Sequence, residues 1–190
     1  EHLRTMPSAS GGGIESLIST QAGVSMNNEL SSQYSVRGGN YDENCVYVNS
    51  IEIYRPLLIR SGEQEGLSFV NPDMVESVAF SSGGFGVQYG DKMASVLDIK
   101  YKRPTHFEGS ASISLLGATA YIGSATNKFS QMHGFRYKTA SYLLGTMETE
   151  GEYNPNFIDY QTYITYNFSP KWQLNFLWNI SRNSYTFMPQ

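Results

Sequence analysis

The feature that most constrains the fold is an alternation of apolar and polar side chains between residues 157 and 180. The even positions of the first half are Ile158, Tyr160, Thr162, Ile164, Tyr166 and Phe168, and the odd positions include Asp159, Gln161, Thr165 and Asn167. After the turn Ser169-Pro170-Lys171, the even positions are again apolar, namely Trp172, Leu174, Phe176, Trp178 and Ile180. A period of two is the repeat of a β-strand, so the pattern predicts an antiparallel hairpin with one apolar, aromatic face.

The length of these strands bears on the class of protein. Strands of soluble sandwiches average about five or six residues, whereas a strand that crosses a bilayer needs roughly 9 to 11 tilted residues. The alternation alone fits both a soluble sandwich and a membrane barrel. No apolar run approaches the roughly 18 residues of a transmembrane helix, and no signal-peptide pattern opens the chain. If the protein is exported, we expect its signal peptide to be missing from this sequence.

Composition excludes other classes of function. The chain of 190 residues is 40% hydrophobic with a formal net charge of -4, and no block of Lys or Arg suggests a nucleic-acid partner. Aromatic residues make up 14% of the chain, which favours sheets bordered by interfaces. The single cysteine, Cys45, lies in the apolar run CVYV and is interpreted as a buried hydrophobic residue.

A glycine cluster, SSGGFGVQYGD, raises the question of a phosphate-binding loop. Its Gly84, Gly86 and Gly90 are spaced G-x-G-x-x-x-G, and the strand-like run VLDI follows instead of a helix. A dinucleotide fingerprint needs G-x-G-x-x-G opening a helix, so we interpret the cluster as turns between strands.

Other residues give no sign of catalysis. The three histidines, His2, His106 and His133, lack metal-ligand spacing, and no nucleophile motif is present. Asp42-Glu43-Asn44 is interpreted as a solvated acidic turn. The sequence therefore predicts neither an enzyme nor a cofactor.

The pattern of apolar, polar and turn residues divides the chain into three parts. Residues 1–13 read as a polar linker, and a short helix is expected from Ile14 to about Thr20. Residues 14–104 alternate short apolar runs with turns, which predicts a mixed α/β unit with one helical turn beginning at Pro72 ahead of a strand from Ser77 to Phe80. From 105 to 190 the segments lengthen, and we expect antiparallel strands at 108–124, 127–136, 139–149, 157–168 and 171–187.

The order of short motifs in residues 14–104 resembles the plug domain of TonB-dependent outer-membrane receptors. The matching segments, in order, are Ala22-Gly23-Val24, Val36-Arg37-Gly38-Gly39, Val46-Tyr47-Val48-Asn49-Ser50, Val70 to Val78, Ser82-Gly83-Gly84, Tyr89-Gly90 and Val96-Leu97-Asp98-Ile99. The segment YSVRGGNYDEN is most similar to the corresponding segment of receptors of the Bacteroidetes. The resemblance implies a plug domain followed by the first transmembrane strands of a large, 22-stranded β-barrel. Five strands cannot close a barrel, so the chain is expected to be part of a longer protein.

The resemblance also assigns roles to residues. Gly38, Gly39, Gly83, Gly84 and Gly90 would form the structural turns of the plug. Arg37 would latch the plug to barrel glutamates, although the second family arginine is replaced by Ser82, and Asn49-Ser50 replaces the usual Asp-Gly. A surface arginine ahead of a turn is the alternative. For ligand contact we single out the plug loop residues Tyr54, Arg55, Arg60, Glu63 and Gln64, which offer aromatic, cationic and acceptor groups. The alternative is that Pro56, Leu57 and Leu58 anchor this loop as inert filler of the plug.

The implied function is import of a nutrient across the outer membrane of a Gram-negative bacterium. The implied partners are the TonB complex, acting through a segment ahead of Glu1, the outer-membrane lipid and a surface lipoprotein lid. Turns near 137 and 170 would face the periplasm, and links near 125 and 152 the outside. Two alternatives remain open: a barrel that is a structural partner in an outer-membrane assembly, and a soluble β-rich binding module.

Overall fold

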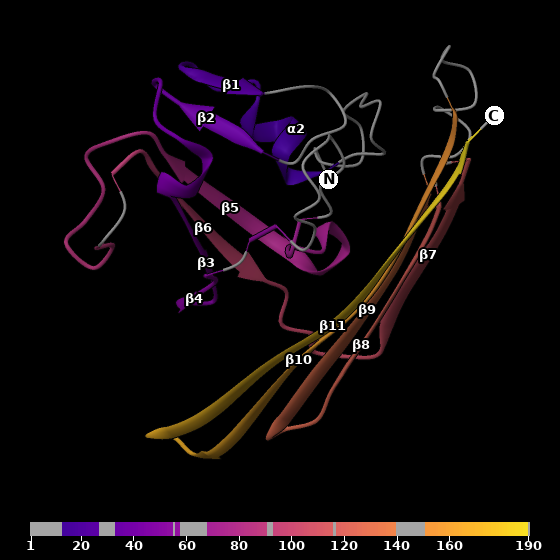
Figure 1. The fold of residues 1–190 in the computed structure, drawn as a ribbon. Coiled ribbons are helices and arrows are strands. Elements are labelled where there is room, and N and C mark those ends of the chain that lie inside the picture. The colour runs from indigo at the N-terminus through magenta and orange to yellow at the C-terminus, as the bar shows by residue number, and fades with distance from the viewer. Residues whose placement is uncertain are drawn as a thin grey trace. The chain divides into compact units, whose positions relative to one another are not determined.

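A computed structural model describes residues 13–26, 33–54, 56–57, 68–90, 93–115, 117–139 and 151–189. The chain divides into two compact units, residues 1–102 and residues 103–190. Figure 1 shows the helices and strands of both units.

The first unit is built on a four-stranded sheet in the order β4-β3-β6-β5. Its strands are β3 (Asn44–Val48), β4 (Ile51–Glu52), β5 (Val75–Ser81) and β6 (Ser95–Tyr101). Strands β3 and β6 are parallel, and the other two pairs are antiparallel. The smaller elements are α2 (Ile14–Ile18), the antiparallel pair β1 (Val24–Met26) and β2 (Tyr34–Val36), and the 3-10 turns η1 (Tyr41–Glu43) and η2 (Pro72–Met74).

One face of this sheet forms the core of the unit. Val46 and Val48 of β3 and Leu97 and Ile99 of β6 lie on it and are buried, as the alternation along each strand requires. In α2 the buried residues are Ile14 and Ile18, which are four apart and share one helix face. The rings of Tyr34 in β2 and Phe80 in β5 meet edge to face at 6.3 Å.

Buried polar groups connect the elements of the core. Asn44 Nδ2 donates to the Tyr34 carbonyl at 2.8 Å, and its Oδ1 accepts from Ser95 Oγ at 2.7 Å. These two bonds join β2, β3 and β6 without leaving the amide unpaired, which a buried amide requires.

The predicted helix and helical turn both form, with shifted ends. α2 ends at Ile18, because Ser19 and Thr20 donate their hydroxyls back to the carbonyls of Ser16 and Leu17, and Gly23 then takes a φ of 81°. η2 begins at Pro72 as predicted, and β5 then begins at Val75, two residues earlier than expected.

The second unit is a five-stranded antiparallel sheet in the order β11-β10-β9-β8-β7 (Figure 1). Its strands are β7 (Glu108–Ser114), β8 (Gly117–Ala125), β9 (Phe129–Thr139), β10 (Gly151–Ser169) and β11 (Trp172–Pro189). Each strand pairs with the next one in the chain, so the unit is an up-and-down meander.

Register gives this sheet two distinct faces. On the apolar face Thr162 lies opposite His133 and Trp178, and the exposed large hydrophobic residues of this face are Ile113, Ile122, Phe135, Ile158, Tyr166, Phe168, Trp172, Leu174, Phe176, Trp178 and Ile180. On the polar face Arg136 lies opposite Asp159, and the buried polar residues include Arg136, Asp159, Gln161 and Thr165. Exposed apolar and buried polar side chains reverse the distribution of a soluble domain and are typical of a transmembrane barrel wall.

Several predicted strand bounds were wrong. The expected strand 108–124 is two strands, because Gly117 takes a φ of 145° next to the chain reversal between β7 and β8. The strand expected at 127–136 is β9 and continues through the supposed polar turn to Thr139. Of the strand expected at 139–149, all but residue 139 lies outside the described residues.

The predicted sidedness of the turns was partly wrong. Residue 137 lies within β9 and forms no turn. The turns near 126 and 170 lie at the same edge of the sheet, since Tyr166 is opposite Phe129 and Ser169 is opposite Trp172. They therefore face the same side of a membrane, whereas the beginning of β10 at Gly151 lies at the opposite edge.

Candidate functional site

The predicted ligand loop is only partly described. Tyr54 follows β4 and is 82% exposed. Arg55, Arg60, Glu63 and Gln64 lie outside the described residues. The loop returns to the sheet through a β-bridge between Leu57 and Ser68, and the Phe69 N–H donates to the Pro56 carbonyl at 2.7 Å.

Arg37 occupies a backbone conformation that few residues other than glycine adopt, with a φ of 51°. Its N–H donates to the Gly23 carbonyl at 2.8 Å, and the residue is exposed. A Cβ at Gly23 would lie 3.3 Å from Arg37 Cγ, and a Cβ at Gly83 would lie 3.2 Å from Arg37 Nη1. The arginine side chain therefore runs between the turns at Gly23 and Gly83.

The predicted turn glycines differ in their surroundings. Gly38, Gly83 and Gly84 have positive φ values. Gly39 is enclosed, because an added Cβ would lie 2.8 Å from Ala94 Cβ and 3.2 Å from the Val36 carbonyl. Gly90 has open space around it and no positive φ.

Tyrosines gather on the second face of the four-stranded sheet of the first unit, around Asp98. Tyr89 donates its hydroxyl to Asp98 Oδ2 at 2.9 Å, and its ring meets that of Tyr47 edge to face at 5.1 Å. Lys100 Nζ lies 3.6 Å from Asp98 Oδ1. The bond to Asp98 raises the pKa of Tyr89, and desolvation adds to it. Desolvation raises the pKa of Tyr47 to about 12, so both phenols stay protonated over the physiological range.

Exposed apolar side chains mark the loops next to Tyr54. The loops before β3 and β6 are joined where the Ala94 N–H donates to the Glu43 carbonyl at 3.2 Å. These loops expose Tyr41, Val87 and Met93, the last at 84%. Sequence reasoning missed all three, although apolar residues inside a glycine-rich turn segment were a usable signal.

The polar face of the second unit carries a buried ion pair. Arg136 donates to Asp159 Oδ2 from Nε at 2.8 Å and from Nη2 at 2.5 Å, and Asn179 Nδ2 donates to Asp159 Oδ1. The three residues come from β9, β10 and β11, so the network crosses three strands. Alternation predicted that Asp159 and Gln161 share a face, but the pairing with Arg136 depends on a register that the sequence did not reveal.

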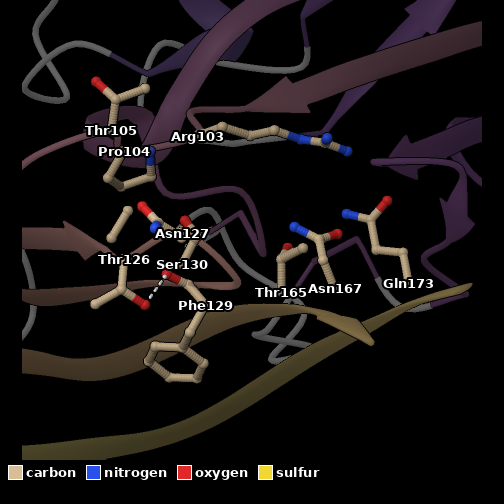
Figure 2. Close-up of a pocket in the computed structure, with 11 residues that line it drawn as sticks. Arg103, Pro104, Thr105, Thr126, Asn127, Phe129, Ser130, Thr165, Asn167 and Gln173 are labelled. Atoms are coloured by element: carbon tan, nitrogen blue, oxygen red, sulfur yellow. Dashed lines mark hydrogen bonds between the residues drawn. The ribbon is translucent and has the colours of Figure 1, made fainter. Parts of the chain in front are cut away.

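A polar pocket of about 340 Å³ lies at the edge of the second unit that carries the turn near 126. Figure 2 shows the guanidinium of Arg103 and the amides of Asn167 and Gln173 directed toward the same space. The amides of Asn127, Asn167 and Gln173 make no hydrogen bond to another described residue. The lining contains one cation and no carboxylate, so the pocket suits an acceptor group or an anion.

The histidines that the structure describes serve local hydrogen bonds. His133 Nδ1 lies 2.8 Å from the Tyr160 hydroxyl and 2.9 Å from the Thr162 hydroxyl, and His106 Nδ1 lies 3.1 Å from Thr105 Oγ1. Within the described ranges, no three His, Cys, Asp or Glu side chains are grouped so that they could hold a metal ion.

Comparison with known proteins addresses the first unit directly. Residues 5–96 match the family model of the TonB-dependent Receptor Plug Domain. This segment is a TonB-dependent receptor plug domain. The motif order that suggested the plug from sequence is thus confirmed as far as the receptor class.

Solved structures extend the likeness to the strands after the plug. The siderophore receptor PirA from Pseudomonas aeruginosa matches with a TM-score of 0.65 and 18% identity, over 97% of this chain and 32% of that one. The outer membrane transporter YddB from Escherichia coli matches with a TM-score of 0.65 and 14% identity, over 96% and 32%. The G324V mutant of the ferric enterobactin receptor PfeA from P. aeruginosa matches with a TM-score of 0.62 and 17% identity, over 95% of this chain and 31% of that one. No curated protein matches the chain.

These matches confirm the predicted fold class, a plug domain followed by antiparallel barrel strands. At such low identities the likeness to the solved receptors concerns the fold. The chain spans about a third of the length of these receptors, at 31% to 32%. The predicted location is the outer membrane of a Gram-negative bacterium. The plug domain over residues 5–96 supports it, since receptors with this domain reside there.

In the part of the chain that the structure describes, no helix is both long and apolar enough to span a bilayer.

Proposed function

We propose that the protein is an outer-membrane active transporter that imports a nutrient with energy supplied by the TonB complex. Receptors with this plug domain are transporters. The observation that carries the proposal is the succession of a plug domain over residues 5–96 and a meander that exposes large apolar side chains on one face and buries polar side chains on the other.

The proposed mechanism follows from the two faces of the barrel wall. The apolar face would contact outer-membrane lipid, and the polar face would line a lumen that the plug occludes. The outer membrane has no ATP, so work must come from the inner membrane. TonB would pair by β-addition with a segment N-terminal to the plug and pull, remodelling the plug to open a path.

Ligand contact is proposed for the exposed plug loops. Tyr54 and the loop residues Arg55, Arg60, Glu63 and Gln64 remain the proposed contacts. Tyr41, Val87 and Met93 support an extension of this surface, because their apolar side chains are exposed on loops that the Ala94 to Glu43 bond holds together. The cargo itself is not assigned.

Three finer proposals accompany this function. The plug extends over 14–104 after a linker at 1–13, and the barrel begins at 105. The receptor is of the Bacteroidetes type and works with a surface lipoprotein lid. Arg37 latches the plug to a barrel carboxylate, for which its position between two turns leaves the guanidinium accessible.

The test is a transport assay in cells that express the full-length receptor. We expect a heat-modifiable outer-membrane protein and nutrient uptake that stops when TonB is deleted. Arg55→Ala with Arg60→Ala should lower uptake while barrel assembly persists, and Arg182→Ala, exposed on β11 and outside the loop, is the matched arginine control.

Two results would contradict the proposal. Membrane residence with uptake that is indifferent to TonB would favour a structural partner in an outer-membrane assembly. A product that stays folded in buffer without detergent would favour a soluble binding module.

A further inference from the structure

Two short turns lie side by side at one edge of the barrel sheet. One connects β8 to β9 and contains Lys128, and the other connects β10 to β11 and contains Lys171. The Asn167 N–H donates to the Lys128 carbonyl at 2.8 Å, which ties the first turn to β10. The Lys171 N–H donates to Ser169 Oγ at 3.3 Å, which fixes the second turn.

The two turns enclose a hollow of about 550 Å³, called here the turn-edge hollow. Its lining residues are Lys128, Asn167, Phe168, Ser169, Pro170, Lys171, Trp172 and Gln173. It adjoins the polar pocket, with which it shares Asn167 and Gln173.

Positive charge is concentrated at this edge. Lys128 and Lys171 line the hollow, Arg103 lines the adjoining pocket, and no Asp or Glu lines either one. Among the described residues, neither lysine side chain has an ion-pair or hydrogen-bond partner. The chain as a whole has a net charge of -4, so this cluster departs from the average and would attract an anion.

The hollow also lies at the end of the apolar face. Phe168, 60% exposed, and Trp172, 74% exposed, are the last large apolar residues of β10 and the first of β11 at this edge. Aromatic side chains of barrels gather where hydrocarbon meets water, and basic residues just beyond them face the lipid headgroups. The two lysines are therefore at headgroup depth if the apolar face contacts lipid.

We propose that the turn-edge hollow binds the phosphate of an anionic phospholipid headgroup. The ammonium groups of Lys128 and Lys171 pair with the phosphate, and the amides of Asn167 and Gln173 donate to its oxygens. Phe168 and Trp172 pack beside the glycerol and upper acyl chain. This inference rests on the proposed outer-membrane function, because it requires the apolar face to be in lipid.

Photocrosslinking in vesicles tests the site. The full-length receptor is reconstituted in phosphatidylcholine vesicles that contain a trace of phosphatidylglycerol or of phosphatidylcholine, each with the same photoreactive acyl chain. Crosslinks are located by mass spectrometry. Each lysine near a membrane surface contributes about a fivefold preference for anionic lipid at low salt, the fold-change that corresponds to about 1 kcal/mol. We expect residues 167–173 to crosslink phosphatidylglycerol at least about fivefold more than phosphatidylcholine.

Variants separate this site from general attraction. Lys128→Gln with Lys171→Gln should make crosslinking of residues 167–173 to phosphatidylglycerol and to phosphatidylcholine about equal, with heat modifiability unchanged. Arg182→Gln is the matched control, because Arg182 is exposed on the same face near the opposite edge, and it should leave the preference intact.

The outcomes distinguish this inference from the function on which it rests. Crosslinking to 174–180 without a preference at 167–173 would overturn the lipid site and leave membrane residence standing. A preference that survives in the double lysine variant would also overturn the site. If inorganic phosphate removes the preference for phosphatidylglycerol and chloride at the same ionic strength does not, the hollow binds free phosphate, and the lipid proposal is overturned. No lipid crosslinks anywhere would contradict the outer-membrane function itself.

Discussion

The buried ion pair on the polar face gives the sharpest prediction about stability. The side chains of Arg136 and Asp159 are 7% and 0% exposed, so water cannot replace a lost partner. Removing one member of such a pair costs about 3 to 5 kcal/mol, because the other charge stays buried without compensation. Arg136→Met should destabilise the protein by about 3 kcal/mol, toward the lower end, since Asn179 still donates to Asp159.

The paired replacement tests the cause of that loss. Arg136→Met with Asp159→Leu removes both charges and keeps the volume roughly constant, which is often close to neutral for a buried pair. We expect the double variant to lie within about 1 kcal/mol of the wild type, so that the two substitutions are strongly non-additive.

The assay is denaturant unfolding of the reconstituted receptor, followed by tryptophan fluorescence and fitted for the free energy of unfolding. Thr119→Ala is the control, because among the described residues the Thr119 hydroxyl bonds only to the exposed Ser112 side chain, at 2.9 Å, and the loss of this bond should cost under about 1 kcal/mol. If Arg136→Met costs no more than Thr119→Ala, or if the double variant equals the sum of the single ones, the reasoning is refuted.

Three further predictions concern glycine, alkaline stability and ligand contact. Gly117→Ala should lower the free energy of unfolding by at least about 2 kcal/mol, because at a φ of +145° the added Cβ would clash with the Tyr137 carbonyl oxygen. Gly90→Ala, in open space, should change it by under about 0.5 kcal/mol, and equal effects would contradict this. The pKa of Tyr47 is raised from 10.0 to about 12, so its contribution to stability is complete below pH 10 and is lost as the pH rises to about 12. Tyr47→Phe should reduce the alkaline loss in a pH series of unfolding free energies, and an unchanged series would rule out this role. Met93→Glu should weaken ligand binding in a titration without lowering the thermal midpoint, since the side chain is 84% exposed; unaltered binding would remove Met93 from the proposed surface.

Local sequence patterns predicted the type of each element better than its limits. The alternation from 157 to 180 fixed both faces of β10 and β11, because period two maps directly onto a pleated strand. It could not show that β10 begins at Gly151, since residues 151–157 do not alternate in the same way. The sequence did not predict the reversal between β7 and β8. The segment Ser114-Leu115-Leu116-Gly117 contains only two residues that favour turns, Ser114 and Gly117.

Long-range contacts account for most of what the sequence did not predict at the candidate site. Arg136 and Asp159 are 23 residues apart, and only the β9–β10 register brings them together. Tyr89 and Asp98 are closer in sequence, yet their bond depends on how the glycine-rich loop folds back on β6. Motif order predicted the plug because its turn glycines and short strands are encoded locally, as at Gly38 and Gly83.

The central claim is that the second unit is a membrane-spanning wall with its apolar face in lipid. Spin labels placed one at a time at positions 172–180 test this claim most directly. Cys45 is first replaced by alanine so that each label is unique within this segment. In vesicles, collisions with oxygen should peak at the even positions 174, 176, 178 and 180, and collisions with a water-soluble nickel reagent should stay low there. A profile without a two-residue period, or even positions open to the nickel reagent, would contradict the account.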